Sequence, residues 1–262
     1  MSDTPDRRHL PPETAAPPSL TAALLLRSPR GGNAFEECVE KLLQTVRLGI
    51  VPPGERLPAE RELAGMMGVS RDTLREALAS LADAGYLVAR RGRYGGTFVA
   101  EVLPEPAAPP PHGSSADTAP AAGFDAATIH DVLTLREILE PGAARIAAGR
   151  SLSAEERETL WSALRDTATA GAADYRRLDS RLHLVIAELA GSPSLLPVMA
   201  ENRMRVNALL DGIPLLERNI RHSNEQHQAL VVAVLTGNGE DAARVMSEHI
   251  AGSAALLRGF LS

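Results

Sequence analysis

One aspartate and three histidines in the C-terminal half of the sequence have the residue types of a metal site. Asp179 and His183 are four residues apart in a segment with helical apolar periodicity, so both side chains leave one helix face beside the core. His227 and His249 lie among apolar residues in two later segments that are also predicted to be helical. A carboxylate and three imidazoles that converge inside a helical bundle suit Zn²⁺, Ni²⁺ or Mn²⁺ and can leave positions for an exogenous ligand. The spacing alone does not separate this interpretation from ordinary hydrogen-bonded core or surface histidines.

A second group of residues has the chemistry of DNA recognition. Residues 61–81 predict two short helices, the first ended by Gly68 and the second capped by Ser70. The second helix carries a buried apolar stripe, and three polar residues near its start are left to project elsewhere: Arg71, Thr73 and Arg75. This layout is a helix-turn-helix, whose second helix offers its N-terminal side chains to the major groove.

A basic hairpin follows these two helices. Residues 86–88 and 97–99 are predicted strands, and residues 90–96 form a tip rich in arginine and glycine. A helix-turn-helix followed by a basic hairpin is typical of a winged helix. An ordinary helical hairpin beside a surface β-hairpin would not explain arginines in both places, so the pattern favours DNA binding.

The composition limits the remaining possibilities. The chain has 262 residues, of which 44% are hydrophobic and only 3% aromatic, so its cores must be built from small aliphatic residues that favour helices. A net charge of −6 means that DNA affinity must come from a local patch. Lys41 is the only lysine, which excludes a fused pyridoxal-phosphate domain, and Cys38 is the only cysteine, which excludes an internal disulfide and a cysteine-based zinc finger. We find no secretory signal pattern and expect a cytoplasmic protein.

Changes in amino-acid composition along the chain predict two folded domains in a mostly α-helical protein. Residues 1–32 are predicted to form a disordered tail rich in proline and alanine, and residues 33–100 to form the winged helix-turn-helix with its small β-wing. Residues 101–123 form a linker rich in proline and alanine, and residues 124–262 form an all-α antiparallel bundle of six or seven helices.

Local signals predict where several of these helices begin or bend. Asn33 is followed three residues later by Glu36, and Ser153 is followed by Glu156, so both pairs predict a capping box. Pro141 predicts a kink within the helix that begins near residue 126.

Several N-terminal motifs carry a family resemblance. They are residues 49–64, residues 68–78, residues 85–88 and the Arg-Gly-Arg of the hairpin tip. Together, over about residues 34–100, they resemble the winged-helix domain of GntR-type bacterial transcription regulators. In such relatives the DNA contacts come from the arginine of the Glu-Arg-Glu-Leu run, the start of the recognition helix and the wing-tip glycine. The resemblance therefore implies DNA contacts from Arg61, Ser70, Arg71, Thr73, Arg75 and Gly92.

Four C-terminal motifs carry a second resemblance. They are residues 135–148, Leu178-Asp-x3-His183, His227-x-Ala-Leu and Met246-Ser-Glu-His249-Ile. Over about residues 124–258 they resemble the FCD ligand-binding domain of the FadR subfamily. The resemblance implies that a divalent metal ion is held by Asp179, His183, His227 and His249.

The same resemblance implies that Arg136 anchors an acidic effector, because a guanidinium pairs well with a carboxylate. Arg203 and Arg205 are further candidates for this role, whereas His222 lies too far round its helix from His227 to be a co-ligand. The sequence departs from the relatives at Gln226, where they usually have glutamate, and at Ser192, where they often have asparagine. These departures leave the effector open.

These observations predict a transcription regulator and not an enzyme. We expect a homodimeric repressor that binds a palindromic operator in double-stranded DNA and responds to a small organic acid bound at the metal ion and Arg136. Two alternatives stay open at this point: a metal-dependent enzyme carried on a DNA-binding domain, and a sensor for which the metal ion itself is the signal.

Overall fold

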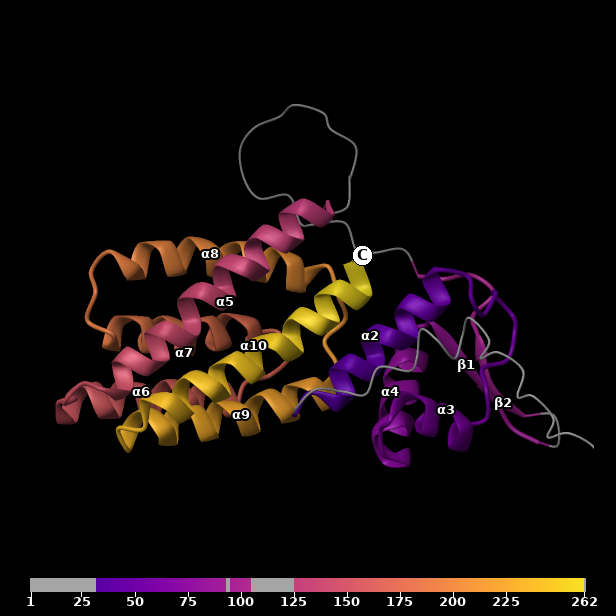
Figure 1. Ribbon diagram of the computed structural model, residues 1–262, viewed down its shortest axis with the longest axis horizontal. Coiled ribbons are helices and arrows are strands. Elements are labelled where there is room, and N and C mark those ends of the chain that lie inside the picture. The colour runs from indigo at the N-terminus through magenta and orange to yellow at the C-terminus, as the bar shows by residue number, and fades with distance from the viewer. Residues whose placement is uncertain (1–31, 93–94, 105–124, 262) are drawn as a thin grey trace, which may run out of the picture.

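The computed structural model describes residues 32–92, 95–104 and 125–261, and these are mostly helical. A winged helix lies at one end and a helical bundle at the other (Figure 1). The elements in chain order are α2 (Ala34–Arg47), α3 (Glu60–Met67), α4 (Arg71–Asp83), β1 (Leu87–Arg90), β2 (Gly96–Val99), α5 (Ala126–Ala148), α6 (Ala154–Ala168), α7 (Tyr175–Leu189), α8 (Leu195–Asp211), α9 (Glu217–Leu235) and α10 (Gly239–Leu261). The predicted tail, most of the predicted linker, and Arg93 and Tyr94 at the hairpin tip lie outside the described residues.

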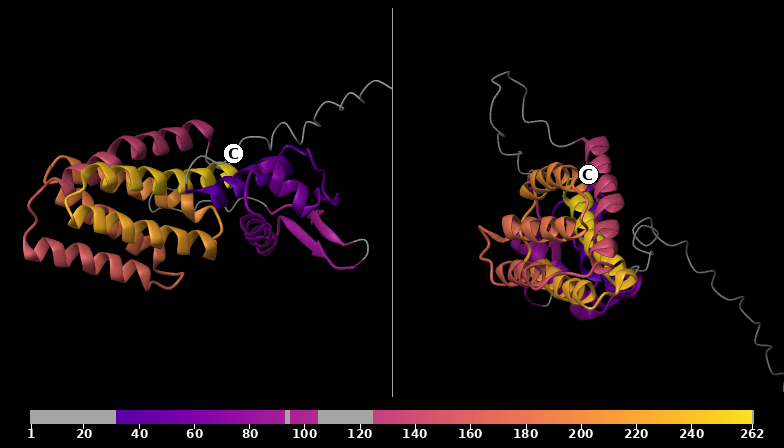
Figure 2. Two further views of the ribbon diagram at one scale, coloured as in Figure 1. Left: turned by 60° about the horizontal axis from the view of Figure 1, so that its bottom comes forward. Right: turned by 90° about the vertical axis from the view of Figure 1, so that its left-hand side faces the viewer.

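The helix-turn-helix follows from two local signals that the sequence shows. Gly68 ends α3 in the left-handed conformation with φ of 67°, which glycine adopts without a steric penalty. Ser70 caps α4, because its hydroxyl accepts a 3.0 Å hydrogen bond from the backbone N–H of Thr73. The wing is an antiparallel pair in which Leu87 faces Val99, and it points away from the bundle (Figure 2). The predicted winged helix-turn-helix is confirmed.

The bundle consists of the six helices α5 to α10 in the described part of the chain. Its second helix, α6, begins at the predicted capping box, in which Ser153 and Glu156 exchange hydrogen bonds. Helix α5 continues through Pro141 as one helix of 23 residues. No helix in the described ranges has both the length and the apolar character needed to cross a membrane.

The predicted capping box at the start of α2 is wrong. The side chain of Asn33 makes no hydrogen bond to the first turn of α2. It is buried and instead contacts α9 and α10, where its amide nitrogen donates to the carbonyl of Glu248 (2.6 Å). The carboxylate of Glu36 is also buried, and it accepts from Asn219 and from Nδ1 of His222. This contact with Glu36 places His222 between the two regions, and the hydrogen bond raises the pKa of the histidine.

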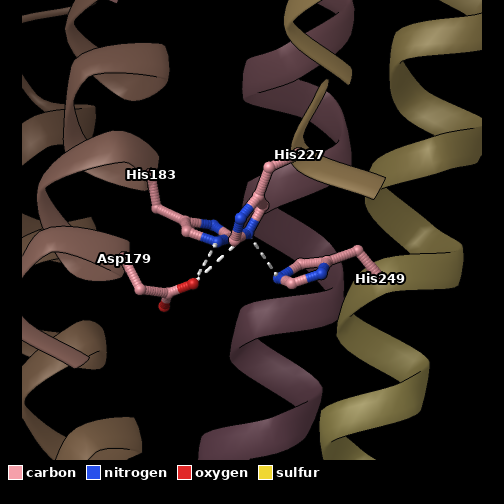
Figure 3. Close-up of side chains that lie close together, drawn as sticks. All are labelled: Asp179, His183, His227 and His249. Carbon is pink, nitrogen blue, oxygen red and sulfur yellow. Dashed lines mark hydrogen bonds and ion pairs between the residues drawn. The ribbon is translucent and has the colours of Figure 1, made fainter. Parts of the chain in front are cut away.

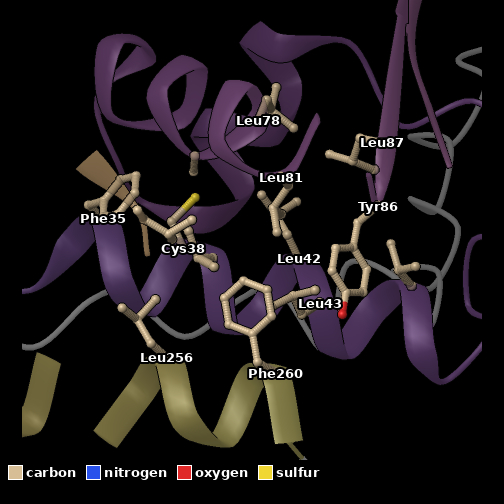
Figure 4. Packing of buried hydrophobic residues seen from close by; sticks show 14 of the residues in the cluster. Phe35, Cys38, Leu42, Leu43, Leu78, Leu81, Tyr86, Leu87, Leu256 and Phe260 are labelled. Atoms are coloured by element: carbon tan, nitrogen blue, oxygen red, sulfur yellow. The ribbon is translucent and has the colours of Figure 1, made fainter. Parts of the chain in front are cut away.

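The winged helix and one end of the bundle share a hydrophobic core, although their sequences predict two separate domains. Leu256 and Phe260 of α10 point into the cluster formed by α2, α4 and β1 (Figure 4). The ring of Phe260 meets that of Tyr86 edge to face, with ring centroids 5.7 Å apart. The close approach of α10 to α2 needs Gly259, since a Cβ at that position would lie 2.8 Å from the Cα of Glu40.

Replacing Phe260 with alanine should destabilise the protein by about 3–5 kcal/mol, because it removes a fully buried ring and leaves a cavity between α2 and α10. Urea unfolding followed by circular dichroism would measure the change. Ile146→Ala is the matched control, because the side chain of Ile146 is exposed on α5 and its loss should matter little. Equal effects of the two substitutions would contradict the shared core.

Candidate metal centre and DNA-binding surface

The four predicted metal ligands converge on one point inside the bundle. Asp179 and His183 come from α7, His227 from α9 and His249 from α10, and all four are buried (Figure 3). One ligand atom from each residue can be chosen so that all lie within 4.8 Å of one another. The Nε2 atom of His227 lies 3.2 Å from Oδ1 of Asp179 and 3.3 Å from Nε2 of His249. Ligand atoms placed tetrahedrally about 2.1 Å from a zinc ion are separated by about 3.4 Å, so the set fits a cation of this size.

The hydrogen bonds of His183 show which of its nitrogen atoms faces the cluster. Its Nδ1 lies 2.7 Å from Oε2 of Glu140, so Nδ1 carries the proton and donates to the carboxylate. Its Nε2 is buried and has no hydrogen-bond partner. A buried nitrogen lone pair without a partner costs free energy, and a bound cation would use it. The Glu140–His183 pair is the arrangement that orients histidine ligands in metalloproteins.

A network of buried charges surrounds the cluster. Glu140 accepts from Nε of Arg136 at 3.0 Å and lies 3.5 Å from a guanidinium nitrogen of Arg203. Arg203 also pairs with Oδ2 of Asp179, which leaves Oδ1 directed at the histidines. The arginines Arg136 and Arg203 are each 2% exposed. Each buried charge therefore has an opposite partner at short range.

The charge states that follow suit metal binding. Burial opposes ionisation of Asp179, but the nearby Arg203 guanidinium outweighs it and holds the pKa of this carboxyl well below its usual range. Burial likewise opposes ionisation of Glu140, and the charge of Arg136 keeps its pKa well below the ordinary value. Burial lowers the pKa of both His183 and His249, which stay neutral. Ionised carboxylates and neutral imidazoles are the forms that ligate metal ions.

The three candidate arginines of the effector site lie in three different environments. Arg136 is buried, donates to Glu140 and to the hydroxyl of Ser253 (2.7 Å), and lines a groove of about 380 Å³ between α5 and α10. Arg203 is the buried partner of Asp179. Arg205 is half exposed and pairs with Asp131, so it takes no part in the network.

The sequence pattern assigned no role to Glu140 and did not indicate that Arg203 pairs with Asp179. The sequence does hold a signal for Glu140, since it lies four residues after Arg136 on the same helix and directly follows Ile138 and Leu139. Nothing local in the sequence indicates the partner of Arg203, because it is 24 residues away on another helix.

The predicted DNA-contacting residues lie on α3 (Arg61), at the start of α4 (Ser70, Arg71, Thr73 and Arg75) and at the wing (Gly92). The exposed members are Arg61, Ser70, Arg71, Arg75 and Gly92. Thr73 is partly buried, and its hydroxyl lies 2.8 Å from that of Ser70, so these two side chains hold the start of the helix. Arg75 pairs with Glu60 at 2.9 Å on the surface. Because solvent screens an exposed pair of this kind, Arg75 can exchange it for a DNA contact at little cost.

Gly92 suits a close approach to a ligand. Its φ of 107° is unfavourable for residues with a side chain, and a Cβ at this position would meet nothing within 4 Å. The backbone at this point of the wing is therefore open to solvent.

Comparison with known proteins gives two family matches. Residues 35–99 match the family described as "Bacterial regulatory proteins, gntR family", and residues 131–252 match the family described as "FCD domain". A protein of Mycobacterium gastri, named as an HTH-type transcriptional regulator, RmpR, is 33% identical over 81% of this chain and 76% of its own length. A protein of Escherichia coli strain K12, named for regulation of an L-lactate dehydrogenase operon, is 31% identical over 75% of this chain and 76% of its own length. Among solved structures, a GntR protein of Streptococcus agalactiae is 27% identical with a TM-score of 0.41, covering 84% of this chain and 98% of that one.

Replacing Glu140 with glutamine should destabilise the protein by about 3–5 kcal/mol, because it leaves the charges of Arg136 and Arg203 buried without sufficient compensation. Chemical denaturation of the metal-stripped protein would measure this. Glu137→Gln, an exposed position on the same helix, should change stability little. A neutral result for Glu140→Gln would show that the network does not stabilise the bundle.

Proposed function

The chain belongs to the gntR family of bacterial regulatory proteins and carries an FCD domain, and from that premise we propose that it is a homodimeric repressor. It is a DNA-binding transcription regulator by family and not an enzyme. In our proposal, residues 33–100 bind a palindromic operator in the cytoplasm. Residues 124–262 hold a divalent metal ion and a small carboxylic acid, and residues 101–123 link the two domains.

One observation carries the proposed metal site. Four buried ligand atoms from three helices meet at separations that suit a single ion, and the unpartnered Nε2 of His183 is one of them. The ligands are Asp179, His183, His227 and His249, and the ion is Zn²⁺, Ni²⁺ or Mn²⁺. The bound cation would supply a positive charge that attracts an anionic effector.

The proposed acid would bind near Arg136. This arginine reaches the groove between α5 and α10 on one side and bonds to Glu140, the partner of His183, on the other. A carboxylate that replaced Ser253 at the guanidinium would therefore be linked to the metal ligands through Glu140. L-lactate is one acid to test, because one relative is named for an L-lactate dehydrogenase operon.

A pure metal sensor is a second candidate function. Its support is that the cluster offers four protein ligand atoms within 4.8 Å of one another, and four is the number that completes the coordination of zinc without an exogenous group. In that case the metal ion alone would change operator affinity.

Arg71→Ala and Arg75→Ala should each weaken the preference of the protein for its operator about 10- to 100-fold, and the double substitution should abolish it, because each lost base contact costs about 1–3 kcal/mol of discrimination. The operator would first be selected from random duplexes by the full-length protein, and gel shifts would then compare it with unrelated DNA. The control Arg165→Ala removes an exposed arginine of α6 and should leave the preference intact. Sequence-specific shifts that survive both substitutions in α4 would refute the assignment of the recognition helix.

Metal-stripped protein should bind one Zn²⁺ per chain, and His183→Ala should weaken this binding at least about 100-fold because a direct ligand is lost. Competition with a chromophoric chelator would measure the affinity. His130→Ala, an exposed histidine of α5, is the control and should bind as the parent does. Equal binding by the parent and His183→Ala would exclude the proposed site.

Operator binding titrated with Zn²⁺ alone, and then with Zn²⁺ plus L-lactate or other short carboxylic acids, separates the two candidate functions. A response that needs an acid supports the effector-dependent repressor. A full response to Zn²⁺ alone supports the metal sensor.

A further inference from the structure

A chain of hydrogen bonds joins the metal cluster to the first helix of the winged-helix region. Nδ1 of His249 lies 3.2 Å from Oε1 of Gln226 in α9. Nε2 of Gln226 donates to Oδ1 of Asn33 at 3.1 Å, and Nδ2 of Asn33 donates to the carbonyl of Glu248 at 2.6 Å. Asn33 directly precedes α2, whereas the other three residues belong to the bundle.

The carbonyl of Glu248, at the end of this series of hydrogen bonds, fixes the donor and the acceptor in each of them. A backbone carbonyl only accepts, so Asn33 must turn its amide nitrogen to Glu248 and its oxygen to Gln226. Gln226 must then donate to Asn33 with its nitrogen, and its oxygen must face His249.

An amide oxygen also only accepts, so His249 must carry its proton on Nδ1. Its Nε2 is then unprotonated and can only accept, so Nε2–H of His227, 3.3 Å away inside the cluster, donates to it. A bound cation would take the place of that proton. The docked position of Asn33 therefore selects the tautomer of His249 that can bind a metal ion through Nε2.

We propose that Asn33 and Gln226 act as a relay that couples metal binding to the docking of α2 on the bundle. The inference rests on the metal site of the proposed function and adds its route to the DNA-binding region. A metal ion on Nε2 holds the proton on Nδ1, which keeps Gln226 and Asn33 in the orientation that binds Glu248. By linkage, a docked Asn33 must strengthen metal binding by the same factor by which metal strengthens docking.

Asn33 packs tightly against α10 at this contact. Asn33 is 4% exposed, and a Cβ on Gly252 of α10 would lie 2.9 Å from Oδ1 of Asn33. Only a glycine at this position lets the asparagine reach the carbonyl of Glu248 without displacement. Gln226 alone would be enough to orient His249. The further hydrogen bond from Gln226 to Asn33 therefore has another effect, which is to connect His249 to the winged-helix region.

The relay can reach the DNA-binding surface because α2 packs on the recognition helix. Residues of α2 and α4 lie in the same buried cluster, including Leu42 and Leu81. A change in how firmly α2 is held on the bundle thus changes how firmly α4 is held.

Gln226→Glu tests the relay while leaving His249, the proposed metal ligand, in place. A carboxylate at this position still accepts from Nδ1 of His249, but it cannot donate to Asn33. Zn²⁺ affinity of the full-length protein would be measured by chelator competition, and hydrogen–deuterium exchange of the α2 amides would be followed with and without Zn²⁺. In the parent, Zn²⁺ should slow exchange in α2 by about fivefold or more. In Gln226→Glu, Zn²⁺ should bind within about tenfold of the parent and no longer slow that exchange.

Asn33→Asp and Asn219→Ala form a matched pair for the reverse direction. Asn33→Asp keeps the shape but loses the donor to Glu248, so it should weaken Zn²⁺ binding about tenfold. Asn219→Ala removes a hydrogen bond to Glu36 at the same interface but outside the relay. It should speed exchange in α2 equally with and without Zn²⁺ and leave the metal affinity unchanged.

The possible failures are distinguishable. If the parent binds no Zn²⁺, the metal site of the proposed function is refuted and the relay with it. If the parent binds Zn²⁺ but exchange in α2 does not respond, or responds equally in Gln226→Glu, the metal site stands and the relay is refuted.

Discussion

The pairing of buried charges inside the bundle is the constraint on which the candidate site depends. Arg136, Glu140, Asp179 and Arg203 are all removed from water, and an isolated charge in such a place would be strongly unfavourable. Their pairs join α5, α7 and α8, so these helices can adopt only an arrangement that satisfies every charge at once. The ligand pair on α7 is held in place by the same contacts. Protein contacts alone therefore direct Oδ1 of Asp179 at the histidines, 3.2 Å from Nε2 of His227 and 3.8 Å from Nε2 of His183.

Most of the fold could be predicted from the sequence because it follows from local signals. Gly68 and Ser70 set the turn between α3 and α4 through their own backbone and side-chain preferences, and Ser153 begins α6 in the same way. The candidate ligands could be named as well, through spacing and family resemblance. Their convergence is a property of the structure, since His249 is 22 residues from His227 and on a different helix. The pairing of Arg203 with Asp179 has no local signal at all.

Asn33 and Ser153 show where local prediction fails. Both residues precede a helix and both have glutamate three positions later, yet only Ser153 makes the capping box. The difference is burial. Ser153 is exposed, and its side chain contacts only the first turn of its own helix among the hydrogen bonds that the structure describes for it. Asn33 is enclosed by α9 and α10 and must satisfy both ends of its amide there. A pattern of four residues contains no information about such a distant partner.

The shared core has a consequence for the order in which the protein can fold during synthesis. Leu256 and Phe260 are among the last residues of α10 to leave the ribosome, yet they complete the cluster around Phe35 and Leu43. A nascent chain that has exposed only its winged helix therefore lacks part of that core, although N-terminal domains commonly fold first. The winged helix reaches its final packing only after α10, the helix that carries His249, has been synthesised. A ribosome that stops early would release a chain whose winged helix has an uncovered apolar face, which exposes such a product to proteolysis.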